Sequence, residues 1–265
     1  MSAQTPKMPV LFVSHGMPTM VETPVPTRRF LQQLGEQIPR PVSILCISAH
    51  FEAWLPMVTG AGSPETIHDF YGFPAFMYEK QYPAPGDPAL ARAVTQRLAD
   101  AGIEARLDEN RGLDHGAWVP LMLMYPEAAI PVVQLSIQTE KGPGHHVELG
   151  RALAPLRRQG VLLLASGGAT HNLTEMRSHR QDDPPAPYAA AFDAWLEDAL
   201  CNGKTETLIE YENRAPEARR NHPYPAEHFL PLFVSLGAAG RHASAKRLHS
   251  AFLYGVLSMA AYAWE

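Results

Sequence analysis

The sequence predicts a three-layer α/β fold: a single domain over residues 1–265, built around a largely parallel or mixed central sheet. Two observations lead to this prediction. Four short runs are continuously apolar, as in strands covered on both faces, and they lie at residues 9–14, 43–48, 132–137 and 161–165. Segments with helical periodicity separate most of these runs, and such alternation is typical of a sheet with helices on both sides.

The clearest helical pattern covers residues 90–101, where apolar residues recur on one face. Asp87 is a suitable N-cap for this helix, and Gly102 follows its end. Further helices are predicted over residues 146–158 and 188–200. The long, proline-rich connection of residues 60–88 is expected to form loops that build a pocket over one edge of the sheet.

A fourth helical pattern, over residues 225–239, contains Pro231. Proline lacks an amide hydrogen and clashes with the preceding turn, so a kink or a late helix start is expected there. Residues 250–264 form the most apolar segment, but it is too short to span a bilayer. We therefore expect a C-terminal element of the core and no membrane partner.

Composition narrows the class of protein. Hydrophobic residues make up 46% of the 265 residues and charged residues 18%, which is typical of a soluble globular chain. The net charge is −5 and no run of Lys or Arg stands out, so nucleic acid is not an expected partner. No feature of the sequence points to a particular oligomeric state.

Cysteine usage bears on the compartment. Only two cysteines are present, and Cys46 lies inside an apolar run, where it is expected to be a small core residue. The first ten residues lack the basic start and apolar stretch of a signal peptide. A disulfide framework is therefore excluded, and the cytoplasm is the expected location.

Histidine is the informative residue type, with 12 copies. Three of the predicted strands lead into one: His15, His50 and His171. Because the carboxyl ends of strands line the ligand crevice of open α/β sheets, these side chains can converge. Each alone could simply cap its strand, but three in parallel settings favour a shared site. Convergent imidazoles suit a divalent metal such as zinc or iron.

Residues 227 and 228 offer a further ligand. Neighbouring side chains on a helix diverge by about 100°, so only one of Glu227 and His228 should face the metal. Ligation by Glu227 would give two histidines and a carboxylate, as in non-haem Fe(II) oxygenases, whereas His228 would give an all-histidine, zinc-like site. The sequence leaves both possibilities open.

Two more histidines lie in loops with aromatic neighbours. His115 precedes Trp118, and His68 lies in an aromatic-rich segment with Phe73. Both histidines could hydrogen-bond a substrate while the aromatic residues form a wall against a planar ring; for His68, stabilisation of its own turn is an equally good interpretation. Most of the remaining histidines are expected at the surface: His145, His146, His179, His222, His242 and His249.

These segments together resemble the class III extradiol dioxygenase superfamily, and most closely its branch of 4,5-DOPA dioxygenase-like proteins. The matching pieces occur in family order over nearly the whole chain: Ser14-His15-Gly16-x-Pro18, Ser48-Ala49-His50, Ile67-His68-Asp69-Phe70-x-Gly72-Phe73-Pro74, Tyr82-Pro83-Ala84-Pro85-Gly86, Asp114-His115-Gly116-x-Trp118, Gln134-Leu135-Ser136-Ile137, His171-Asn172-Leu173 and Glu227-His228-x-Leu230-Pro231-Leu232. Each piece is weak alone, but the set is specific.

The resemblance implies roles for particular residues. His15, His50 and His228 would hold one divalent ion, either Fe(II) for dioxygenase activity or Zn(II) as in some relatives. His171 would be a further ligand or the acid/base beside the metal, and His115 would line the substrate pocket. The implied substrates are a small aromatic diol and O2.

Two positions depart from the family pattern. Met17 stands where the family usually has Ser, and Phe51 where it usually has Trp. Both are neighbours of expected ligands, so they bear on substrate fit more than on metal binding.

Two other classes of function remain open at the level of sequence. A zinc hydrolase would use the metal to activate water and would work without oxygen. A non-catalytic binding protein of the same fold would take up no oxygen with any catechol.

Overall fold

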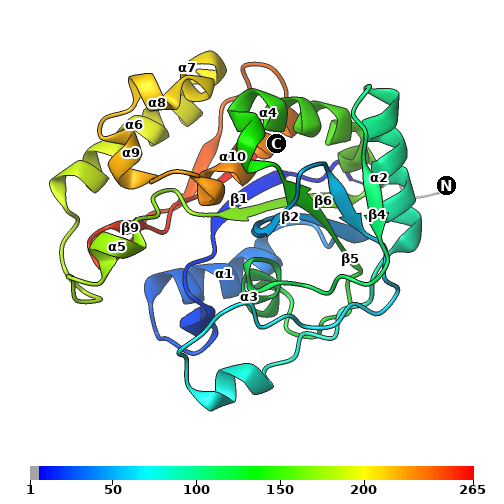
Figure 1. Ribbon diagram of the computed structural model, residues 1–265, viewed down its shortest axis with the longest axis horizontal. Coiled ribbons are helices and arrows are strands. Elements are labelled where there is room, and N and C mark those ends of the chain that lie inside the picture. Colours follow the sequence, from blue (N-terminus) through cyan, green and yellow to red (C-terminus); the bar gives the residue numbers. More distant parts are fainter. Residues whose placement is uncertain (1–5) are drawn as a thin grey trace.

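The computed structural model, which describes residues 6–265, has one eight-stranded mixed sheet through its centre (Figure 1). Four parallel strands form the middle in the order β5-β2-β6-β1: β5 (Val132–Ile137), β2 (Ser43–Glu52), β6 (Val161–Gly167) and β1 (Val10–Ser14). Two further strands extend the sheet on each side. Beyond β5, β3 (Met57–Thr59) pairs antiparallel to β5 and parallel to β4 (Arg106–Asp108). Beyond β1, β10 (Ala261–Trp264) pairs antiparallel to both β1 and β7 (Lys246–His249). The predicted α/β fold with a mixed sheet is confirmed.

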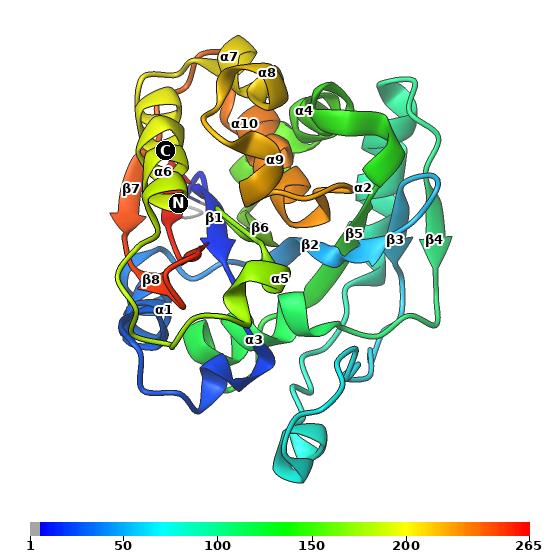
Figure 2. The same cartoon turned by 60° about the vertical axis from the view of Figure 1, so that its left-hand side comes forward.

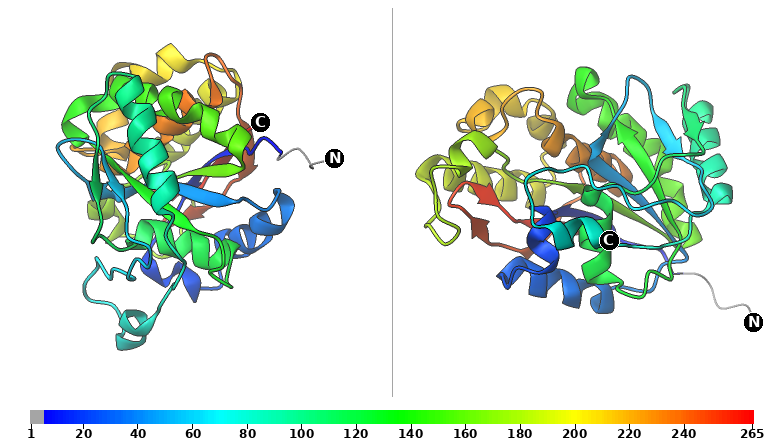
Figure 3. Two further views of the ribbon diagram at one scale, coloured as in Figure 1. Left: turned by 90° about the vertical axis from the view of Figure 1, so that its right-hand side faces the viewer. Right: turned by 60° about the horizontal axis from the view of Figure 1, so that its bottom comes forward.

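Helices cover both faces of this sheet (Figures 1 and 3). On one face lie α1 (Pro26–Gln37) and α3 (His115–Met124), and on the other lie α2 (Pro88–Asp100), α4 (Gly142–Leu153) and α10 (Leu230–Ala239). The remaining α-helices are α5 (Leu173–Met176), α6 (Pro187–Cys201), α7 (Thr205–Ile209), α8 (Tyr211–Arg214) and α9 (Ala218–Asn221). A small hairpin of β8 (Phe252–Leu253) and β9 (Leu257–Ser258) precedes β10.

Five short 3-10 helices connect these elements: η1 (Pro18–Val21), η2 (Ala75–Glu79), η3 (Thr139–Lys141), η4 (Ala154–Gln159) and η5 (Glu227–Phe229). The segment around η2 projects from the body of the molecule (Figure 2). Among residues 6–265, no helix is both long and apolar enough to cross a membrane.

The central strands are buried on both faces and divide their side chains between two cores. In β1, Val10 and Phe12 belong to the core under α4 and α10, whereas Leu11 and Val13 belong to the core over α1 and α3. Successive side chains of a strand point to opposite faces, so a strand in the middle layer must be apolar at every position. This requirement explains the continuous apolar runs of the sequence.

The helices follow the predictions closely where local signals are strong. Asp87 caps α2 as expected, with its side chain accepting a hydrogen bond from the Leu90 amide, and α6 spans the predicted 188–200. Pro231 lies in the first turn of α10, which is the late start that the proline allowed. The predicted helix over 146–158 differs, because α4 begins at Gly142 and gives way to η4 where Pro155 removes a backbone donor.

Two of the six histidines grouped as mostly surface residues depart from that expectation. His146 and His222 are buried. The His146 ring pairs with the Gly142 carbonyl and the Gln138 amide, at 2.6 and 3.1 Å, and His222 Nε2 lies 2.9 Å from the Ala169 carbonyl. Backbone partners therefore hold both rings inside the protein, at both nitrogens of His146 and at Nε2 of His222, and a polar local sequence does not reveal this.

The termini also bear on the predictions. The C-terminal segment is part of the core as predicted, because β10 pairs with β1 and its Trp264 side chain is buried. Cys46 is a buried free thiol, also as predicted. The prediction that the first ten residues lack a signal peptide falls partly on residues 1–5, which lie outside the described residues.

Helices α4 and α10 approach so closely that their contact requires glycine. A Cβ atom added at Gly150 would lie 2.0 Å from the Val234 carbonyl oxygen, and one added at Gly237 would lie 1.9 Å from that of Val147. Backbone atoms cannot give way as a flexible side chain can, so a side chain there would separate the helices.

We expect Gly150→Ala to lower the free energy of unfolding by about 1–3 kcal/mol, as overpacking does in well-packed cores. The matched control is Gly144→Ala in the same helix, where an added Cβ meets nothing within 4 Å. That control should be neutral or more stable, because alanine favours helix over glycine. Urea denaturation of both variants measures the difference, and equal midpoints would contradict the close contact.

Candidate metal centre

The predicted histidines come together because their strands are neighbours. The sheet order β2-β6-β1 places the carboxyl ends of three adjacent parallel strands side by side. His50 lies within the end of β2, His15 directly follows β1, and His171 lies in the loop after β6. Adjacent strands are about 4.8 Å apart, so side chains from these ends can share one small volume.

The fourth histidine arrives from η5, which packs against the end of β6. The Gly168 amide donates a hydrogen bond of 2.9 Å to the His228 carbonyl. An added Cβ at Gly167 would lie 2.1 Å from that same carbonyl oxygen, so only glycine permits this approach. The Gly167-Gly168 pair thus admits the backbone that carries His228.

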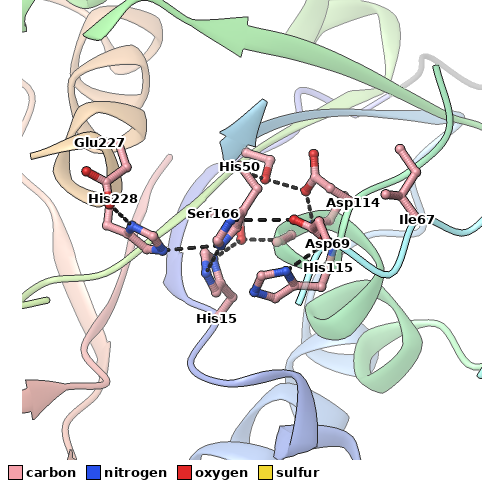
Figure 4. Close-up of polar contacts among 12 residues, drawn as sticks. His15, His50, Ile67, Asp69, Asp114, His115, Ser166, Glu227 and His228 are labelled. Atoms are coloured by element: carbon pink, nitrogen blue, oxygen red, sulfur yellow. Dashed lines mark hydrogen bonds and ion pairs between the residues drawn. The ribbon is translucent and has the colours of Figure 1, made fainter. Parts of the chain in front are cut away.

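Three imidazole nitrogens meet at the centre of the cluster (Figure 4). The Nε2 atom of His50 lies 3.1 Å from Nε2 of His15 and 3.2 Å from Nε2 of His228. With metal–nitrogen bonds of about 2.0–2.1 Å, tetrahedral ligands lie roughly 3.4 Å apart. The two separations from His50 Nε2 therefore fit ligands of a single cation.

Hydrogen bonds at the other ring nitrogens decide where the lone pairs point. His15 Nδ1 lies 3.0 Å from the Ser166 hydroxyl oxygen. Because Ser166 donates its own hydrogen to the Gly116 carbonyl, it must accept from His15. His228 Nδ1 lies 2.8 Å from Glu227 Oε1, and a carboxylate can only accept.

His50 Nδ1 faces an anion instead of a hydrogen-bond acceptor in direct contact: Asp69 Oδ2 lies 3.5 Å away, and its charge favours a proton on that nitrogen. With a proton on each Nδ1, all three Nε2 atoms carry lone pairs that face one another. Such an arrangement is repulsive unless a cation lies between them, and outer partners of this kind are typical of metal-bound histidines. The donor set therefore fits a divalent metal.

The geometry also bears on the choice between Glu227 and His228. Two groups of three possible ligands have their ligand atoms within 4.8 Å of one another: His15, His50 and His115 form the first, and His171, Glu227 and His228 form the second. However, the Glu227 carboxylate is already the acceptor for His228 Nδ1, whereas His228 Nε2 points to His50. This arrangement favours His228 as the ligand and Glu227 as the residue that orients it.

His171 lies against the cluster and is not one of the three converging rings. Its ring stacks on that of His228 with centroids 3.5 Å apart and planes at 10°, and its Nδ1 lies 4.0 Å from Glu227 Oε1. Burial lowers the pKa of His171 to about 4, so the imidazole is neutral at neutral pH. A neutral ring beside a metal site can accept a proton.

Asp69 supports the opposite side of the cluster. Its Oδ1 accepts hydrogen bonds from the backbone amide and Nδ1 of His115, at 2.9 and 3.0 Å. Burial alone would raise the pKa of Asp69, but these bonds and the neighbouring imidazoles lower it to about 2. One ionised carboxylate therefore orients both His50 and His115, whose ring centroids are 3.9 Å apart.

Burial keeps the converging imidazoles neutral. It lowers the pKa of His50 to about 3 and holds the pKa values of His15 and His228 well below their usual range. Nearby imidazoles act in the same direction, since two protonated rings would repel. Neutral imidazole is the form that binds a metal.

The predicted substrate residues lie at different distances from this centre. The ring of His115 lies against that of His50, with centroids 3.9 Å apart, and its role in the substrate pocket stays a prediction. His68 is half-buried, with Nε2 2.9 Å from the Lys80 carbonyl, and its ring lies near Trp118. Trp118 is fully buried and donates to the Ile67 carbonyl, and Phe73 packs against Phe70. Substrate contacts by His68, Phe73 and Trp118 stay predictions.

Other residues line the small cavity at His15 and His171. They include Leu173, Leu257 and Met259, and none of them was predicted from the sequence. Ser166 and the carboxylate of Asp69 were also missed as partners of the histidines. A signal for Asp69 existed in the His68-Asp69-Phe70 segment, but its pairing with residue 115 is a long-range contact.

A parallel-centred α/β sheet that gathers neutral imidazoles at its carboxyl edge has the architecture of a metal-dependent enzyme. Comparison with known proteins agrees. Residues 3–263 match the family described as the catalytic LigB subunit of aromatic ring-opening dioxygenase. The chain belongs to this family.

Individual relatives match over most of their length. The 4,5-DOPA dioxygenase extradiol of Beta vulgaris is 48% identical, covering 95% of this chain and 94% of the relative. The protein of the same name from Escherichia coli K12 is 43% identical, covering 88% and 85%. An uncharacterized E. coli K12 protein of known crystal structure has a TM-score of 0.81 and 35% identity, covering 97% of this chain and all of that one. The chain is therefore a metal-dependent extradiol dioxygenase acting on an aromatic substrate with O2.

We expect Asp69→Asn to weaken metal binding about 10–100-fold, as loss of an outer-shell partner does. The amide cannot replace an anionic acceptor for two imidazoles. Asp182→Asn is the matched control, because Asp182 is exposed and outside the site. Competition with a chromophoric chelator for Zn(II) measures both affinities. Equal affinities in the two variants would show that Asp69 does not orient the ligands.

Proposed function

We propose that this protein holds Fe(II) through His15, His50 and His228 and opens the ring of a DOPA-like catechol with O2. The observation that supports this ligand set is the convergence of three Nε2 atoms. That of His50 lies 3.1 Å from that of His15 and 3.2 Å from that of His228. The DOPA-like substrate is suggested by the names of the relatives from B. vulgaris and E. coli.

Iron is proposed over zinc because of the chemistry. Zn(II) has no accessible redox change, whereas ring opening by O2 requires electrons to move between the substrate and oxygen. An all-histidine set also suits zinc, so Zn(II) would occupy the same position without supporting the oxygen reaction. When bound, Fe(II) would supply Lewis acidity that lowers the catechol hydroxyl pKa, together with the redox capacity for O2 chemistry.

The chain's own residues would move the proton. The Glu227 carboxylate favours a hydrogen on Nδ1 of His171 and leaves Nε2 as the base. Since the ring is neutral at neutral pH, Nε2 can accept a catechol hydroxyl proton and later return it. Stacking on His228 keeps the base beside the metal ligands throughout.

Other residues would hold the ring and exclude water. His115, with Nδ1–H fixed by Asp69, presents Nε2 as an acceptor for a substrate hydroxyl. Leu257 and Met259 line the apolar side of the cavity. In the overall reaction the carbon–carbon bond beside the diol breaks, each of its carbons gains one oxygen atom of O2, and a semialdehyde acid results.

Anaerobic loading with Fe(II), followed by addition of O2 and a catechol, should give one O2 consumed per ring opened and a yellow product. An oxygen electrode and absorbance spectra measure both quantities. The Zn(II)-loaded protein is the control and should consume none. Hydrolysis of an ester or amide by the Zn(II) form without oxygen, and no oxygen uptake by the Fe(II) form, would contradict the proposal.

His171→Ala should retain the metal but lower kcat by about 10²–10⁴-fold, the usual loss for a general base. His179→Ala, which removes a histidine outside the cluster, should change neither quantity. Metal content and oxygen uptake are measured on the same preparations. If His171→Ala loses the metal, His171 is a ligand and not the base.

A further inference from the structure

A cavity of about 470 Å³ is lined by residues that lie close in sequence to His50 and Glu227. Three segments form it: the end of β2 with Glu52 and Trp54, the η3 turn after β5 with Glu140 and Lys141, and the loop before η5 with Tyr224. All three lie at the carboxyl edge of the central strands, where the metal centre also lies.

Residues of the cavity lie close in sequence to residues of the metal centre, and one of them acts electrostatically on it. Glu52 lies two residues beyond His50, about 7 Å along a strand, and Tyr224 lies three residues before Glu227. Burial raises the pKa of Glu227, and the Glu52 carboxylate adds to that effect. The two carboxylates are therefore within electrostatic reach of each other.

Charged groups of both signs line this cavity without partners of their own. Within residues 6–265, no ion pair or side-chain hydrogen bond uses the Glu52 carboxylate or the Lys141 ammonium. Glu140, in contrast, accepts a hydrogen bond of 2.8 Å from the Tyr224 hydroxyl. One free anion and one free cation thus face the same space.

The walls of the cavity are aromatic and unusually exposed. The side chain of Trp54 is 85% exposed and that of Tyr224 is 78% exposed. Large aromatic groups left in water beside a concave site commonly contact a ligand. The cavity therefore offers apolar walls for a short carbon chain and two opposite charges for its end.

We propose that Lys141 and Glu52 determine which ring substituent the enzyme accepts, with Lys141 binding a carboxylate and Glu52 an ammonium group. This inference rests on the proposed function. A catechol bound at the metal would extend its side chain past Glu227 into the cavity. A substituent with only one charge would leave either Glu52 or Lys141 without a partner, so it would bind less tightly.

Three catechols that differ only in substituent charge test the assignment. L-DOPA carries both charges, dopamine lacks the carboxylate, and 3,4-dihydroxyphenylpropionate lacks the ammonium group. Binding is measured anaerobically by calorimetry with the Zn(II)-loaded protein, and KM is measured by oxygen uptake with the Fe(II)-loaded protein. The first measurement is independent of turnover.

Lys141→Met should weaken binding of L-DOPA and dihydroxyphenylpropionate about fivefold or more and leave dopamine within about twofold. Glu52→Gln should weaken L-DOPA and dopamine and spare dihydroxyphenylpropionate. The matched controls are Lys246→Met and Glu206→Gln, which remove one exposed charge of each sign from outside the cavity. Neither control should change any of the three affinities.

The outcomes separate the two proposals. If a variant changes all three catechols equally, or none of them, Lys141 and Glu52 do not select the substituent, although ring opening stands. If the wild-type Fe(II) form turns over none of the three catechols, the catechol function itself fails. A crossed pattern, with each variant sparing a different ligand, is the result that supports the assignment.

Discussion

Three imidazole nitrogens face one another in this protein although none of them has a hydrogen to donate. Ser166 and Glu227 each accept the Nδ1 hydrogen of one ring, and the Asp69 carboxylate faces Nδ1 of the third, so the Nε2 lone pairs at the centre lack a donor from the protein. Burial adds to the effect, because it disfavours protonation that would otherwise relieve the repulsion. The fold thus holds three imidazoles in an arrangement that suits a divalent cation, and the outer carboxylates and hydroxyl are placed to maintain it.

Close backbone approach is the structural condition for this arrangement. β6 lies between β1 and β2, so the end of β6 lies below the converging histidines. Gly167 at this end has no Cβ, and the His228 carbonyl occupies the space that a Cβ would need. Glycine allows a second close backbone contact in the helical layer, where Gly150 and Gly237 let α4 pack directly against α10. Because α10 follows η5 directly, the packing of α10 on α4 also fixes where η5 ends. Helix packing and ligand position are therefore mechanically connected.

Local signals made much of this structure predictable, and long-range pairing limits the rest. The four central strands, α2 and α6 follow from apolar runs, caps and periodicity. His15, His50 and His171 follow from their positions after predicted strands, whereas His228 was favoured over Glu227 only by the family motif. In contrast, α3 is buried almost all round and shows no amphipathic pattern, and the short edge strands have too few residues to stand out. The roles of Ser166 and Asp69 depend on contacts 151 and 46 residues away along the chain, which no local pattern records.

The connection of residues 60–88 contributes directly to the histidine cluster, because Asp69 within it contacts two of the histidines. Asp69 joins it to His50 and His115, the Ile67 carbonyl accepts from the Trp118 indole, and the Tyr82 hydroxyl donates to the Tyr125 carbonyl. Tyr71, by contrast, is 91% exposed. A loop anchored in this way cannot leave without disturbing the ligands, whereas its exposed aromatic residues can adapt to what binds. Trp118 supports this loop through its bond to the Ile67 carbonyl, which gives the buried aromatic residue of the family motif a structural role whether or not it also contacts substrate.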